Sequence, residues 1–301
     1  MKLHNTNSEI IDEYLENCFQ GTQRILFNLQ KNKSVSLYDR LRARSYRCMV
    51  YKSVRLVSQK DISEDSYLDK MQEIYRDHFL YLQSGLNLFR LSIERNEYLD
   101  LPVDDVMIEF KVYGFDGYVG INDFIKLFLG CIIGREKRGM QLLRQIDYEK
   151  MRAEHFRVDS YSKYYIEFLK SINNSEAVNQ IDLIRLEVEK SEISRADFIS
   201  DIFLPELDCW ESIIYGDEKV LNENLEKAIV LHNKYWSQSL GFDSSDSPRA
   251  NYPEGLISWP LLAIASLAVD RGMKVTIESD YLPRFLYINY FPINAKVRLP
   301  E

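Results

Sequence analysis

The sequence predicts an all-α fold, a multi-helix bundle of antiparallel helices that forms a single helical domain over residues 1–301. Apolar residues recur at three- and four-residue steps through most of the chain, which is the period of an amphipathic helix. Only 12 glycines and 8 prolines interrupt the 301 residues, so long helices meet few breaks. The composition, 46% hydrophobic and 28% charged, is that of a globular chain with a sizeable core. At most a short extended piece is expected near the C-terminus, around Val275 and Ile277.

The helices follow from this pattern in chain order. The first begins behind the N-cap candidates Thr6, Asn7 and Ser8 and runs to about residue 29, and a short helix starts at Pro102 with Asp104 and Asp105. The other expected helices are 36–59, 63–95 with Gly85 as a candidate bend, 121–133, 135–156, 160–172, 175–192, 195–215 with a kink at Pro205, and 217–237. The glycine-rich segment 114–120 marks a candidate division into an N-terminal half, 1–113, and a C-terminal half, 121–301.

The most apolar run of the chain, 256–269, predicts a buried helix. Ser258 is the expected N-cap, and Pro260 falls in the first turn, where its missing N–H costs nothing. Gly272 is expected to end the helix in the left-handed conformation, with Arg271 beside the negative helix terminus. The run is shorter than the roughly twenty residues that a membrane span needs, so it is a core helix.

A second pattern surrounds this helix. Tyr235 precedes a tryptophan, and the chain after the helix continues through Val275 and Ser279 to Leu286. The residues that complete the pattern are Trp236, Glu254, Gly255, Asp270, Arg271, Gly272, Asp280, Tyr281, Leu282 and Pro283. This order resembles the C-terminal signature of the immunity protein 49 family of bacterial polymorphic toxin systems, over about the last quarter of the chain. The resemblance implies an all-α cytoplasmic protein that neutralises a cognate toxin by binding it. A PoNi-like immunity protein of a different family is the alternative.

Patterns that would indicate catalysis are absent from the sequence. The histidines His4, His78, His155 and His232 are dispersed, and no phosphate-binding loop or nucleophile elbow occurs. The cysteines have no C-x-x-C spacing, so buried hydrophobes are favoured over a disulfide framework, and they are Cys18, Cys48, Cys131 and Cys209. The sequence therefore predicts no catalytic residue, no metal and no cofactor. For an enzyme, Tyr113, Asp147 and His155 offer no convincing constellation.

Charge is unevenly distributed along the chain. Residues 20–60 carry ten basic side chains against one acid, whereas 182–226 carry thirteen acids against four bases. The two blocks either face each other as an ion-pair seam or expose opposite surfaces. The net charge of −8 argues against nucleic acid as the main partner. An exposed acidic face fits a basic toxin surface, and its candidate residues are Asp197, Asp201, Glu206, Asp208, Glu211, Asp217 and Glu218.

These observations favour one function over two alternatives. The favoured reading is an immunity protein that occludes the active site of a polymorphic or type VI toxin, with a nuclease as one candidate. A helical adaptor or regulator of another protein and an enzyme are the alternatives. The N-terminus has no secretory signal pattern, which places the protein in the cytoplasm away from membranes. We expect a monomer or homodimer, and the polar loop 241–255 is the next candidate for the binding surface.

Overall fold

The computed structural model describes most of the chain. The described residues are 8–32, 35–59, 62–93, 98–104, 106–111, 120–151, 159–190, 196–238, 248–249 and 252–288. Several sequence predictions fall outside these residues, namely the caps Thr6 and Asn7, the side chains of His4, Tyr113 and His155, most of the boundary 114–120, and most of the loop 241–255.

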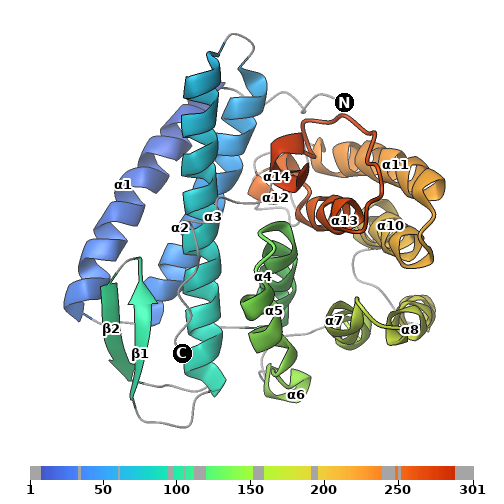
Figure 1. Ribbon diagram of the computed structural model, residues 1–301, viewed down its shortest axis with the longest axis horizontal. Coiled ribbons are helices and arrows are strands. Elements are labelled where there is room, and N and C mark those ends of the chain that lie inside the picture. The colour runs from blue at the N-terminus through green and yellow to red at the C-terminus, as the bar shows by residue number, and fades with distance from the viewer. Residues whose placement is uncertain are drawn as a thin grey trace. The chain divides into compact units, whose positions relative to one another are not determined.

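The structure confirms the all-α prediction, with one two-stranded sheet among the described residues (Figure 1). The chain divides into two compact units. The N-terminal unit comprises 9–158 with 290–301, and the C-terminal unit comprises 159–289 with 1–8. Each unit has its own buried core. All four cysteines are buried and free, as predicted for small hydrophobes.

Three long helices build the N-terminal unit: α1 (Ser8–Asn32), α2 (Val35–Ser58) and α3 (Glu64–Ile93). Helix α3 runs without a break through Gly85, where the sequence suggested a bend. A Cβ at Gly85 would lie 2.7 Å from Leu127 Cδ1, so the glycine serves close packing against α4 (Ile121–Ile133). The predicted start and end of α4 are confirmed.

The short helix predicted at Pro102 is wrong. Strands β1 (Tyr98–Val103) and β2 (Val106–Lys111) form an antiparallel hairpin there, with Val103 opposite Val106. Burial alternates with a period of two in β2, where Ile108 and Phe110 are buried, whereas Leu101, Pro102 and Val103 of β1 are all buried. Asp104 takes a positive φ of 54° at the turn, and its backbone N–H donates to Gln83 of α3 at 2.8 Å. Asp104 therefore lies in a hairpin turn and does not start a helix, whereas Asp105 lies outside the described residues.

The single helix predicted over 135–156 is also wrong. The chain forms α5 (Lys137–Arg144) and α6 (Tyr148–Met151), separated by a short break in which Ile146 is buried. Arg135 takes a positive φ of 53° just before α5, which no helix interior accommodates. Helical periodicity alone predicts a continuous helix here, but the chain leaves the helix after Arg144 and buries Ile146 in the break.

Every regular element in the described part of the C-terminal unit is a helix, and a non-helical segment follows α13. Its elements are α7 (Tyr161–Ser171), α8 (Glu176–Lys190), α9 (Ala196–Phe198), the π-helix η1 (Ile199–Phe203), α10 (Leu204–Tyr215), α11 (Glu218–Trp236), α12 (Pro253–Leu256), α13 (Trp259–Asp270) and α14 (Arg284–Ile288). The π-helix ends at Phe203, two residues before Pro205, where the sequence suggested a kink, and Pro205 lies in the first turn of α10.

Helix α13 is the buried helix that the sequence predicts. Every residue from Leu261 to Ser266 is buried, whereas Leu267 and Val269 remain half-exposed. Gly272 ends the helix with a φ of 80°, as predicted. Ser258 occupies the N-cap position, but its buried hydroxyl accepts no capping hydrogen bond, which corrects the sequence interpretation. The backbone N–H of Ser258 donates instead to the carbonyl of Tyr281 at 3.0 Å.

Candidate functional site

The residues around α13 hold the C-terminal unit together. Arg271 donates to the carbonyl of Ile213 in α10 at 3.0 Å and to the carbonyl of Ile172, the C-cap of α7, at 2.8 Å. It therefore ties the end of α13 to the ends of two other helices. Asp270 beside it is exposed. Arg271 does more than complement its own helix terminus, because it also donates to carbonyls at those two helix ends.

A second group packs α11 against the chain on both sides of α13. A Cβ at Gly255 would lie 2.9 Å from the Trp236 side chain, so only glycine allows this approach. The hydroxyl of Tyr281 donates to Asn233 of α11 at 2.6 Å. Leu282 and Pro283 are buried, while Glu254 and Asp280 are partly exposed. These residues form a scaffold, and the scaffold fixes the course of the segment between Gly272 and Tyr281.

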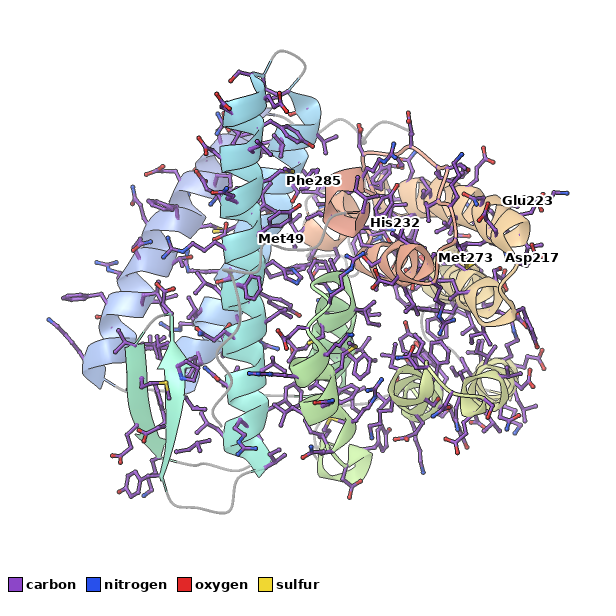
Figure 2. The ribbon with its side chains drawn as sticks, in the orientation of Figure 1. Met49, Asp217, Glu223, His232, Met273 and Phe285 are labelled. Atoms are coloured by element: carbon purple, nitrogen blue, oxygen red, sulfur yellow. The ribbon has the colours of Figure 1, made fainter. Side chains whose placement is uncertain are left out.

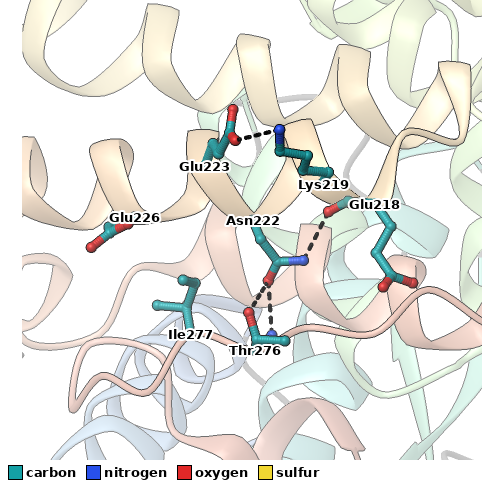
Figure 3. Close-up of a pocket in the computed structure, with 7 residues that line it drawn as sticks. All are labelled: Glu218, Lys219, Asn222, Glu223, Glu226, Thr276 and Ile277. Carbon is teal, nitrogen blue, oxygen red and sulfur yellow. Dashed lines mark hydrogen bonds and ion pairs between the residues drawn. The ribbon is translucent and has the colours of Figure 1, made fainter.

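That segment and the first half of α11 border an acidic groove of about 530 Å³ (Figure 3). Its lining residues are Glu218, Lys219, Asn222, Glu223, Glu226, Thr276 and Ile277. Three carboxylates thus stand against one ammonium group, and Lys219 lies 3.7 Å from Glu223. Glu226 is exposed and has no hydrogen-bond or ion-pair partner among the described residues. Figure 2 shows Glu223 at the outer side of α11.

Asn222 fixes the wall of this groove. Its side-chain amide donates to the carbonyls of Glu218 and Lys274, and its oxygen accepts both the N–H and the hydroxyl of Thr276, each at 2.8 Å. The chain around Val275 and Ile277, where at most a short extended piece was expected, forms neither a helix nor a strand. Side-chain hydrogen bonds from Asn222 hold it in place. Composition alone gave no signal for this role, because it depends on a contact 54 residues away.

Four of the predicted binding acids already have a cationic partner inside the unit. Arg185 of α8 reaches both Asp208 and Glu211 of α10 at 2.7 Å. Lys234 lies 3.0 Å from Asp201, and Arg249 lies 2.8 Å from Asp197. Slight burial acts to raise the pKa of Asp197, but the hydrogen bonds from Arg249 and from the backbone of Phe198, together with the charge of Arg249, lower it overall. These acids stabilise the packing of their own unit.

The remaining predicted acids differ in exposure. Asp217 is the exposed N-cap of α11 and accepts from the backbone of Val220 at 3.0 Å. Glu218 is exposed at the groove and accepts from the backbone N–H of Lys274 at 2.8 Å. Glu206 is buried in the core, so it offers no carboxylate to a partner. The groove therefore gathers Glu218 with Glu223 and Glu226, two acids of the same block that were not singled out from the sequence.

The comparisons with known proteins gave one match. The family model described as immunity protein 49 matches residues 66–286, well over half of the chain. This chain belongs to the immunity protein 49 family. No curated protein and no solved structure matched. The family match extends well beyond the C-terminal signature that the sequence resemblance covered, and it includes α3, the acidic groove and the whole scaffold around α13.

The described residues of this immunity protein 49 family member contain no group of three or more histidine, cysteine, aspartate or glutamate side chains arranged to hold a metal ion. Within the same residues, no helix has the length and apolar character to cross a bilayer. The charged features that do stand out are the acidic groove and the basic block of the N-terminal unit. Some of that block is already paired within its unit, as Arg55 with Asp12 at 3.1 Å.

We expect Glu206→Gln to stabilise the protein at neutral and alkaline pH. Burial raises the pKa of Glu206 well above its ordinary value, so the folded state holds this proton more tightly than the unfolded chain. Stability is therefore lost as pH rises from the unfolded pKa through the folded one, and a glutamine removes that loss. Urea unfolding at about pH 5 and about pH 8 should show a smaller pH dependence for the variant. An unchanged pH dependence would contradict the assignment.

Proposed function

We propose that this protein neutralises a cognate antibacterial toxin by binding it, with the acidic groove of the C-terminal unit as the docking site. Membership of the immunity protein 49 family supports toxin binding as the role. The observation that carries the location is the groove itself, where Glu218, Glu223 and Glu226 line one open depression. A basic loop of the toxin would place a lysine or arginine against these carboxylates.

The charges of the groove favour binding of a cationic side chain. Glu226 has no partner among the described residues, so binding of a cation there breaks no ion pair. Asn222 fixes the groove wall at Lys274 and Thr276, so little backbone freedom of that wall is lost on docking. Toxins that cut nucleic acid hold phosphates with lysine and arginine, and a carboxylate-lined surface competes for the same side chains. The immunity protein would then occlude the active site in a one-to-one complex in the cytoplasm, without chemistry of its own.

The double variant Glu223→Lys/Glu226→Lys tests this location. Both side chains are exposed, so we expect the fold to survive within about 0.5 kcal/mol. Two like-charge contacts with the toxin should weaken binding by at least about tenfold, mainly through slower association, and should remove protection of cells that express the toxin. Binding is measured by calorimetry or biolayer interferometry with the product of the adjacent toxin gene, and protection by plating efficiency.

Asp69→Lys/Glu109→Lys is the matched control. Both residues are exposed in the N-terminal unit, and the change in net charge is identical. This control should bind the toxin with nearly wild-type affinity. Full protection by the groove variant would refute the groove as the docking site, while leaving the family role intact. Failure of the wild-type protein to bind that toxin would contradict the pairing with the adjacent gene product itself.

A further inference from the structure

Helix α1 exposes a stripe of two cations around an aromatic ring. Arg24, Phe27 and Lys31 are separated by three and four residues, so they lie on one face of the helix. All three are exposed, Phe27 by 57%. The Lys31 ammonium sits 4.1 Å above the Phe27 ring, and Arg24 has no ion-pair partner in the part of the chain that the structure describes.

Helix α8 exposes the complementary stripe. Asp182, Leu186 and Glu189 are separated by four and three residues and therefore also share one face. All three are exposed, Leu186 by 45%, and neither acid has an ion-pair partner among the described residues. Each stripe thus consists of two like charges seven residues apart with an exposed apolar side chain between them.

The two stripes match in antiparallel register. Read in opposite directions, both have a spacing of three and then four residues. Arg24 then faces Glu189, Phe27 faces Leu186, and Lys31 faces Asp182. We propose that α1 of one copy docks antiparallel on α8 of a second copy, and that this contact occurs twice in a two-fold symmetric homodimer. A symmetric dimer buries each stripe once per protomer and leaves no stripe of either kind unpaired.

A nucleic acid fits the α1 stripe less well than a second copy. A polyphosphate running along α1 would meet Glu13 and Glu16, which are exposed on the N-terminal half of the same helix. The Phe27 ring has Lys31 over its face, so stacking of a base there would displace an existing cation–π contact. The α8 stripe, in contrast, presents carboxylates only at the two positions where α1 presents cations.

A charge-swap experiment tests the homodimer. Sedimentation velocity of the full-length wild-type protein should show a concentration-dependent dimer. The variants Arg24→Glu/Lys31→Glu and Asp182→Lys/Glu189→Lys should each weaken self-association by at least about tenfold, because each places like charges opposite one another. An equimolar mixture of the two variants should recover the dimer, because every pair across both contacts is again of opposite charge.

The matched control reverses two other exposed cations of the same block. Arg40→Glu/Arg47→Glu makes the same change in charge on α2, outside the stripe, and should leave the dimer intact. Circular dichroism of each variant checks that α1 and α8 remain folded. A wild-type protein that stays monomeric, or variants that fail to associate when mixed, would overturn the proposal. Binding of a labelled single-stranded DNA by the monomer, lost in Arg24→Glu/Lys31→Glu, would assign the α1 stripe to nucleic acid instead.

Discussion

Ala265→Arg should unfold the C-terminal unit. Ala265 is completely buried in α13, between the equally buried Ala263 and Ala268. An arginine there brings a large side chain and a charge into a core without a partner. Such an unpaired charge costs several kcal/mol, a large part of the about 5–15 kcal/mol that stabilises a typical protein. Thermal unfolding followed by circular dichroism should show that the cooperative transition of this unit is lost or shifted far down.

Ala43→Arg is the control for this change. Ala43 is exposed on α2, so the same substitution should alter stability by only about 0.5 kcal/mol. A melting curve of Ala265→Arg that matches wild type would place α13 at the surface and contradict the packing of the C-terminal unit. Because α13 carries Arg271 and leads into the groove segment, loss of this helix should also abolish toxin binding.

The fold class was predictable because helical periodicity is a local property. Helix α13 is the clearest case, since the apolar run 256–269, with Pro260 near its start and Gly272 soon after its end, indicates both the burial and the ends of the helix. The hairpin at β1 and β2 was missed because Pro102 and Asp104 suit either a helix start or a tight turn. Gln83 and Asn87 of α3 decide between them by hydrogen bonding to Asp104 and to the carbonyl of Pro102. No local pattern records that contact.

The candidate site was predictable as a charge block and not as individual residues. Counting acids located residues 182–226, which contain all three carboxylates that line the groove. Which acids remain free depends on tertiary partners, such as Arg185 from α8 for Asp208 and Arg249 for Asp197. The burial of Glu206 also depends on tertiary structure, because it results from the way α10 packs. The sequence lists these residues but does not indicate which of them contact one another in the folded protein.

Lys52→Met is expected to destabilise the N-terminal unit by about 3–5 kcal/mol. The Lys52 ammonium lies 2.9 Å from Asp77 and 3.1 Å from Glu73, and it joins α2 to α3. Asp77 is buried, and burial raises its pKa although Lys52 acts to lower it. Removal of Lys52 leaves the Asp77 carboxylate without its main counter-charge in the core. Equilibrium unfolding in urea measures the loss.

The double variant Lys52→Met/Asp77→Leu separates the cost of an unpaired charge from simple loss of packing. Removing both ions takes away the penalty of burying a lone carboxylate, so the double variant should recover most of the stability. The Lys52→Met deficit should also shrink as pH falls. The folded pKa of Asp77 is raised, so protonation favours the folded state, and the deficit is largest above that pKa. A pH-independent deficit, or a double variant no more stable than Lys52→Met, would show that Lys52 contributes through its methylene chain alone.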